Sequence, residues 1–145
     1  MRLVVGCGSL VRGDDAIGQI VAEALRERLP DAEIIAVTQL TPELAEPLSR
    51  AEKAYFIDAA AACTGEAPGF IRIQQVEQDR AGGAFSHNVT PARLLTAAEA
   101  LYGSAPPTLL ITITAESFAI TETLSPALCA ALPTIMTVTE ACIRE

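Results

Sequence analysis

Residues 1–21 of the chain read MRLVVGCGSLVRGDDAIGQIV, and this stretch indicates how the fold begins. An apolar run over residues 2–5 leads into a loop with three glycines and then into two adjacent carboxylates, Asp14 and Asp15. From residue 15 to about 29, apolar side chains recur every three or four positions, which is typical of an amphipathic helix. We therefore predict a strand, a glycine-rich loop and a helix in that order.

The remaining sequence continues to alternate strands and helices. Strands are expected over 33–37, 54–57, 70–76 and the end of APPTLLITIT (105–114), and helices over 42–50, 90–101 and from 125 onward. This order predicts one α/β domain over 1–145, a three-layer sandwich with a twisted, mostly parallel five-stranded sheet and helices on both faces. Because the 70–76 run alternates apolar and polar residues, we place it at an antiparallel edge of the sheet. Pro133 is expected to kink or divide the last helix.

The composition restricts the partners of this protein. The chain carries 18 acidic and 10 basic residues, for a net charge of −8, which argues against nucleic acid as a partner. The long uncharged stretch between Glu122 and Glu140 contains two prolines and many hydroxyl side chains, so we predict a buried helix rather than a membrane span. No signal peptide is expected, and the four cysteines form no CxxC pair. These features predict a cytoplasmic protein with no membrane partner.

Three ionisable residues follow strands or precede helices where a binding crevice is expected. Ligands of open parallel sheets bind beyond the carboxyl ends of the strands, where the Asp14-Asp15 loop and Asp58 are predicted to lie. The loop that carries His87, the only histidine, leads into the next helix from the same side. A nucleotide site is disfavoured, since Val11 replaces the third glycine of GxGxxG and no GK[ST] is present.

Each of these residues also has a purely structural interpretation. Asp14 and Asp15 are suited to cap the following helix, although one carboxylate would suffice. Asp58 could accept hydrogen bonds from loop amides, and His87 could pack against the helix that begins near Thr90. Taken together, two carboxylates and one imidazole form an incomplete metal shell, which suits a metal ion that a partner brings with its other ligands.

Four segments in register resemble the motifs of nickel–iron hydrogenase maturation endopeptidases. They are VVGCGSLVRGDDAIGQIVAEAL (4–25), AYFIDAA (54–60), FSHNVTPARLL (85–95) and ITAESF (113–118). The resemblance implies an endopeptidase that removes the C-terminal extension of a hydrogenase large-subunit precursor after nickel insertion. It also implies that Asp15, which directly precedes AIG, together with Asp58 and His87, engages nickel supplied by the precursor and carries out catalysis. Asp14 is then left to cap the helix or to support the site.

Two departures from the family pattern concern the substrate. Ser9 follows Gly8 where many relatives have asparagine, so hydrogen bonding in the first loop is expected to differ. The segment AVTQLTPELAEPLSRAE (36–52) lacks the Asp-Gly-rich turn of the family. We expect Gln39 and Glu43 of this segment to line the substrate side and to influence which precursor is recognised.

The residues alone leave several functions and mechanisms open. Water activated by the metal, or by a carboxylate acting as general base, could attack the peptide bond. Attack by Cys7 or Cys63 with His87 is chemically conceivable, but no motif supports it. A non-catalytic chaperone that binds nickel or the large subunit could use the same three residues. A small-ligand α/β domain that binds an anion at the 6–13 loop is the third alternative.

Overall fold

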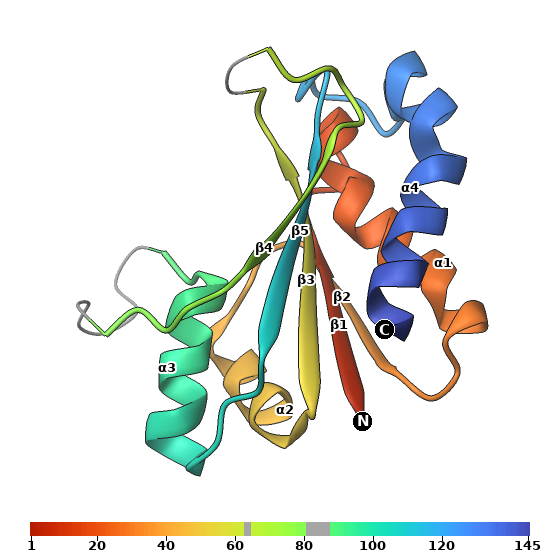
Figure 1. Ribbon diagram of the computed structural model, residues 1–145. Coiled ribbons are helices and arrows are strands. Elements are labelled where there is room, and N and C mark those ends of the chain that lie inside the picture. The colour runs from red at the N-terminus through yellow and green to blue at the C-terminus, as the bar shows by residue number, and fades with distance from the viewer. Residues whose placement is uncertain (63–64, 81–87) are drawn as a thin grey trace.

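The computed structural model describes residues 1–62, 65–80 and 88–145, which form one five-stranded sheet with helices on both faces (Figure 1). The strands lie in the order β2-β1-β3-β5-β4, and only β4 runs antiparallel to its neighbour. Their bounds are β1 Arg2–Cys7, β2 Glu33–Val37, β3 Lys53–Ala60, β4 Ile71–Gln75 and β5 Thr108–Thr114. The predicted mostly parallel sheet with an antiparallel edge strand is therefore confirmed.

The helices divide between the two faces of the sheet. Helices α1 (Ile17–Arg28) and α4 (Pro126–Arg144) cover one face, while α2 (Ala45–Arg50) and α3 (Pro91–Tyr102) cover the other (Figure 1). Short 3-10 turns precede α1 at Gly13–Ala16 and α2 at Pro42–Leu44. The predicted three-layer arrangement is confirmed.

Alternate residues of the parallel strands supply two separate apolar cores. In β1, Val4 faces α1 and α4, whereas Leu3 and Val5 face α2 and α3. In β3, Tyr55 joins the first core and Phe56 the second, and both side chains are almost fully buried. Burial on both faces explains why these strands read as nearly continuous apolar runs rather than as alternating ones.

The spacing of glycines in the first motif is explained by backbone contact between α1 and the sheet. A Cβ atom added at Gly6 would lie 2.1 Å from the carbonyl oxygen of Gly18, and one added at Gly18 would lie 2.3 Å from that of Ile57. Gly8 has a φ of +146°, and a Cβ atom there would lie 1.8 Å from the carbonyl oxygen of Asp15. Only glycine permits these approaches, so the motif brings the start of α1 directly onto the carboxyl ends of β1 and β3.

Helix α4 is a single element, so Pro133 does not divide it, and the alternative expectation of a kink stays a prediction. Pro133 and Cys129, whose carbonyl loses its helical hydrogen bond, are both exposed, so water can satisfy that carbonyl. By length and composition α4 is also the one helix of the described residues that could span a membrane, with a mean hydropathy of 1.5. Its buried residues, among them Leu128 and Ile135, nevertheless lie in the core against the sheet.

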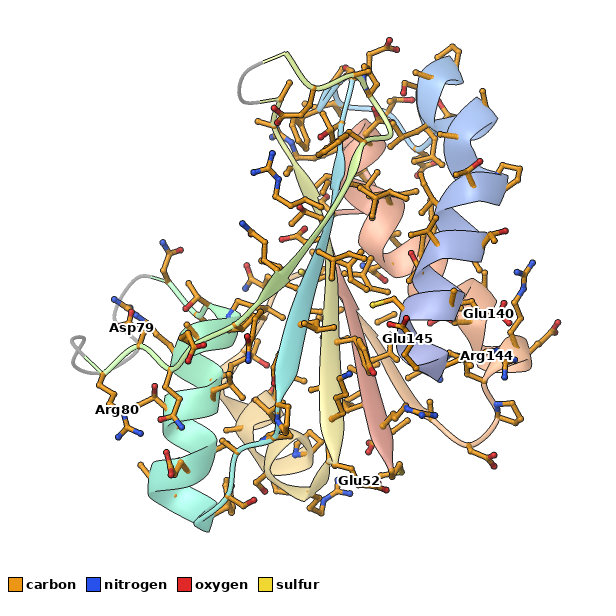
Figure 2. All side chains as sticks on the ribbon, in the orientation of Figure 1. Glu52, Asp79, Arg80, Glu140, Arg144 and Glu145 are labelled. Atoms are coloured by element: carbon orange, nitrogen blue, oxygen red, sulfur yellow. The ribbon has the colours of Figure 1, made fainter. Side chains whose placement is uncertain are left out.

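Ion pairs join the outer surfaces of α1 and α4. Glu140 accepts from the guanidinium of Arg144 at 2.9 Å and from that of Arg28 at 3.2 Å, and Figure 2 shows Glu140 and Arg144 side by side on α4. Because the arginine side chains are half exposed, we expect these pairs to contribute little to stability.

Candidate active site

A groove of about 320 Å³ opens at the carboxyl ends of β1 and β3. The two strands are neighbours, with Gly6 paired to Ile57, so the first loop and Asp58 meet there as the sequence predicted. The groove is lined by one residue of β1, one of β3, the first loop, the loop after β2 and the start of α3. These residues are Cys7, Gly8, Asp15, Thr38, Gln39, Leu40, Asp58, Val89, Thr90 and Pro91.

Asp15 is held in the groove by the loop that precedes it. Its Oδ2 atom accepts a hydrogen bond of 2.7 Å from the backbone N–H of Ser9. The prediction that an aspartate caps α1 is wrong. The N-cap residue of the 3-10 turn is Arg12 and that of α1 is Ala16, and neither makes a side-chain capping hydrogen bond. Instead, the 3-10 turn at Gly13–Ala16 directs the carboxylate of Asp15 into the groove at the ends of β1 and β3.

Asp14 points away from the groove and joins two loops. Its carboxylate accepts hydrogen bonds from the backbone N–H groups of Glu116, Ser117 and Ser125 at 2.7–3.1 Å and from the Ser125 hydroxyl at 2.8 Å. Burial alone would raise the pKa of Asp14, but these hydrogen bonds outweigh it and the pKa is lowered. The two adjacent acids therefore have different roles: Asp14 is structural, and Asp15 faces the groove.

Asp58 lies within β3 rather than at its end, because the strand continues to Ala60. Its Oδ1 atom accepts from the backbone N–H of Ala59 at 2.8 Å, and its carboxylate also accepts from the Cys7 thiol. Burial, together with the negative charge of Asp15, raises the pKa of Asp58 to about 6, despite the two hydrogen bonds that favour the ionised form. A buried carboxylate with a raised pKa beside a second carboxylate is typical of a functional site.

Cys7 is a groove residue that the sequence analysis considered only as a nucleophile without motif support. Burial raises the pKa of its thiol well above the usual range, and the negative charges of Asp58 and Asp15 add to this effect. The side chain therefore remains a protonated hydrogen-bond donor, which disfavours Cys7 as the attacking nucleophile. The register of the sheet explains this contact, since Cys7 and Asp58 both lie one residue beyond a paired position, Gly6 with Ile57. Cys63, the other cysteine considered, lies outside the described residues.

His87, the third predicted site residue, also lies outside the described residues, so its role stays a prediction. The residues that follow it are described: Val89, Thr90 and Pro91 line the groove, and Thr90 caps α3 by accepting from the N–H of Arg93 at 3.2 Å. Within 1–62, 65–80 and 88–145, no three histidine, cysteine or acidic side chains gather to hold a metal ion. Among the described residues the candidate cation ligands are thus the pair Asp15 and Asp58.

The two residues predicted to line the substrate side, Gln39 and Glu43, lie in different surroundings. Gln39 lines the groove and Glu43 does not, so the role of Glu43 toward the substrate stays a prediction. The Glu43 carboxylate instead accepts a 3.0 Å hydrogen bond from the hydroxyl of Thr41, which keeps it in its own turn. Thr41 occupies the N-cap position of that turn but makes no side-chain cap.

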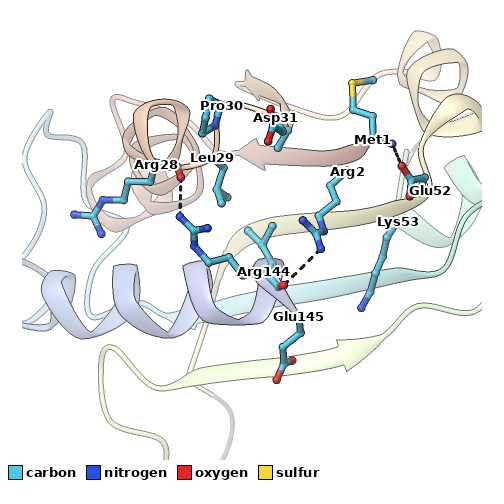
Figure 3. Close-up of a pocket in the computed structure, with 12 residues that line it drawn as sticks. Met1, Arg2, Arg28, Leu29, Pro30, Asp31, Glu52, Lys53, Arg144 and Glu145 are labelled. Atoms are coloured by element: carbon cyan, nitrogen blue, oxygen red, sulfur yellow. Dashed lines mark hydrogen bonds and ion pairs between the residues drawn. The ribbon is translucent and has the colours of Figure 1, made fainter.

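A larger hollow of about 490 Å³ lies at the opposite edge of the sheet (Figure 3). It is lined by acids and bases alike, including Arg2, Lys53, Glu52 and Glu145. None of the residues predicted for chemistry lines it, and the Arg144 guanidinium on its wall already donates to a backbone carbonyl at 2.9 Å. We therefore take the groove at the carboxyl edge as the candidate active site, in agreement with the position of ligands in sheets of this kind.

No family model matches this chain, and a search of the curated proteins gave no match. Solved structures do match over nearly its whole length. The chain is 27% identical to the hydrogenase maturating endopeptidase HybD from E. coli, with a TM-score of 0.78 over 99% of this chain and 91% of that one. It is 26% identical to an endopeptidase from Escherichia coli, with a TM-score of 0.75 and coverage of 99% and 93%.

A more distant match shares the fold. The [NiFe] hydrogenase maturation protease HycI from Thermococcus kodakarensis is 20% identical, with a TM-score of 0.77 over 99% of this chain and 92% of that one. The matched structures span the strands and loops that build the groove, since almost no part of the chain is left uncovered. The resemblance drawn from the four sequence motifs is therefore confirmed, and this chain, a peptidase, is similar in fold and sequence to hydrogenase maturation endopeptidases.

Proposed function

We propose that this protein is the endopeptidase that removes the C-terminal extension of a nickel–iron hydrogenase large-subunit precursor after nickel has been inserted. The observation that carries the proposal is the pair of carboxylates, Asp15 and Asp58, that line one groove in a chain similar to these peptidases. Their sequence separation of 43 residues is closed by adjacent parallel strands and by the glycine contacts of α1.

In this proposal the nickel ion of the precursor is the recognition element. Two carboxylates that interact in a partly buried groove favour a cation between them, since a cation relieves both their repulsion and the cost of ionising Asp58. Asp15, Asp58 and His87 would complete the coordination of nickel that the precursor already holds. A precursor without nickel would lack this contact and would dock poorly, so cleavage would follow insertion of the metal.

Scission of the peptide bond requires an activated water molecule. Activation by the precursor's nickel and activation by a carboxylate remain the two candidate routes. The raised pKa of Asp58, about 6, supports the second, because a general base works best when its pKa lies near the operating pH. Water then attacks the scissile carbonyl carbon while its proton passes to Asp58, and Asp58 returns that proton to the leaving amine as the C–N bond breaks.

The proposed partner is a protein, and the proposed location is the cytoplasm. The net charge of −8 supports a partner other than nucleic acid. The three cysteines of the described residues, Cys7, Cys129 and Cys142, are free thiols, in keeping with a reducing compartment.

The direct test is cleavage of nickel-loaded precursor, scored by mass spectrometry of the product. We expect Asp15→Asn and His87→Ala to abolish processing while the fold, followed by circular dichroism, is retained. Asp31→Asn, an exposed acid at the far edge of the sheet, is the matched control and should process normally. A wild-type protein that binds the precursor but leaves its mass unchanged would favour the non-catalytic chaperone instead.

A further inference from the structure

Two loops beside the groove expose large apolar side chains although both loops are tightly held. Leu10 and Val11, from the loop before α1, are 50% and 51% exposed, and Ile120, from the loop between β5 and α4, is 83% exposed. We call these three residues the loop patch. Apolar residues are common at protein surfaces one at a time, but a group of them on neighbouring loops is typical of an interaction site.

Backbone hydrogen bonds join the two loops. The N–H of Thr121 donates to the carbonyl of Val11 at 3.1 Å, and the N–H of Gly13 donates to the carbonyl of Thr121 at 2.9 Å. These bonds form an isolated parallel bridge between Arg12 and Thr121, so Val11 and Ile120 each lie one residue before a bridge partner. In Figure 1 the segment between β5 and α4 accordingly lies beside the start of α1.

Asp14 fixes the base of the same two loops. Its buried carboxylate accepts from three N–H groups and one hydroxyl of the second loop, and its own N–H donates to the carbonyl of Ser117 at 3.0 Å. The loop patch is therefore preformed, and a partner that covers it would not need to order these loops. Preorganisation of this kind reduces the entropic cost of association.

The loop patch adjoins the groove. Gly8 lines the groove, and the N–H of Ser9 holds Asp15, so Leu10 is the next residue outward along the chain. A protein segment bound against Asp15 would therefore lie beside the start of the loop that carries Leu10. The exposed Arg12 belongs to the same loop, and among the described residues it makes no ion pair. A carboxylate of the partner could pair with it.

We infer that the loop patch is the docking surface for the body of the large-subunit precursor, whose facing surface is apolar with a carboxylate opposite Arg12. This inference rests on the proposed function and adds to it a second contact, separate from nickel. The nickel contact reports whether the metal is present, whereas the loop patch would supply affinity for the folded precursor around it. A few well-buried residues near the centre of an interface contribute most of its binding energy, and arginine is frequent among them.

The test uses Leu10→Glu and Ile120→Glu in the full-length protein, with Leu101→Glu as the matched control. Leu101 is 70% exposed on α3, away from both loops, so its replacement adds the same charge to an apolar surface residue. With nickel-loaded precursor as substrate, we expect each patch variant to raise KM about tenfold or more with kcat nearly unchanged, and the control to match wild type. Arg12→Glu should raise KM in the same way, and all four variants should melt at the wild-type temperature.

The outcomes separate the inference from the proposed function. If wild type cleaves the precursor and the patch variants share the KM of Leu101→Glu, the docking surface is wrong while the peptidase assignment stands. If wild type does not cleave, binding of the same precursor decides: loss of binding only in the patch variants supports the docking surface, and equal binding by all variants overturns it. A wild-type dimer that the patch variants convert to a monomer, without a change in KM, would assign the loop patch to a second copy of this chain and overturn the inference.

Discussion

Replacing Asp58 with asparagine is expected to stabilise the protein while it abolishes cleavage. The substitution keeps the size of the side chain, and the Oδ1 atom of asparagine can still accept from the N–H of Ala59 and from the Cys7 thiol. It removes the ionised form, which burial and the charge of Asp15 disfavour. A residue retained at a cost in stability is expected where function requires its charge.

The expected gain follows from the pKa of Asp58. The pKa rises from an ordinary value of 3.8 to about 6 in the folded state, so the ionised carboxylate destabilises the fold. Each unit corresponds to about 1.4 kcal/mol, which gives an upper value of about 3 kcal/mol above pH 6. Partial exposure of Asp58 and loss of the stronger hydrogen bonds to a charged acceptor reduce this value, so we expect a gain of about 1–3 kcal/mol in the free energy of unfolding.

The pH dependence provides an internal control. Because the folded pKa lies above the unfolded one, the penalty is absent below pH 3.8, grows as the pH rises toward 6 and is constant above it. The advantage of Asp58→Asn should therefore fall to about half between pH 7.5 and pH 5. Urea unfolding of wild type, Asp58→Asn and the surface control Asp31→Asn at both pH values measures these differences. A variant no more stable than wild type at pH 7.5, or a gain that is the same at pH 5, would refute the reasoning.

Three further substitutions test other parts of the structure. Gly6→Ala places a methyl group about 2.1 Å from the Gly18 carbonyl oxygen and should lower the free energy of unfolding by about 3 kcal/mol or more in urea titrations, whereas Gly103→Ala, which meets no atom within 4 Å, should lose only about 1 kcal/mol. Asp14→Asn should destabilise the protein at pH 7, and because the pKa of Asp14 is lowered in the folded state, the difference from wild type should shrink as the pH falls toward that pKa in thermal melts. Cys7→Val removes a hydrogen bond that lowers the pKa of Asp58, so the acid limb of the pH–rate profile for precursor cleavage should move to higher pH, while Cys7→Ser should leave it nearly in place.

Local sequence patterns predicted most of the strands and their succession along the chain. The second strand is found at Glu33–Val37 as expected, and the alternating run near residue 73 forms the antiparallel edge strand β4. The third strand was predicted to end at Ile57, and the alanines that follow have low strand propensity. In the structure β3 continues to Ala60 because it pairs with β5 as far as Thr114. Tertiary pairing thus decided an end that local propensity could not.

The candidate site was predictable where motifs carry it and unpredictable where distant contacts do. Asp15 and Asp58 meet because neighbouring parallel strands deliver them, which the alternation of strands and helices already implied. Asp14 was expected at a helix cap. Its actual partners begin at Glu116, 102 residues away, and such distant contacts leave no local signal in the sequence. Glu43 lies outside the groove lining, and its carboxylate accepts from a hydroxyl two residues away, a local contact that the sequence pattern did not predict.

The backbone contact between α1 and the strands limits how this site can vary among related peptidases. No side chain separates Gly18 from Cys7 and Ile57, so the gap between helix and sheet cannot be widened or narrowed by exchanging a smaller residue for a larger one. The separation of Asp15 and Asp58 is consequently set by main-chain geometry and should be nearly the same in every member that keeps the three glycines. Differences in the precursor that such enzymes accept must then arise in the segments around this constant pair, such as Thr38 to Leu40 here.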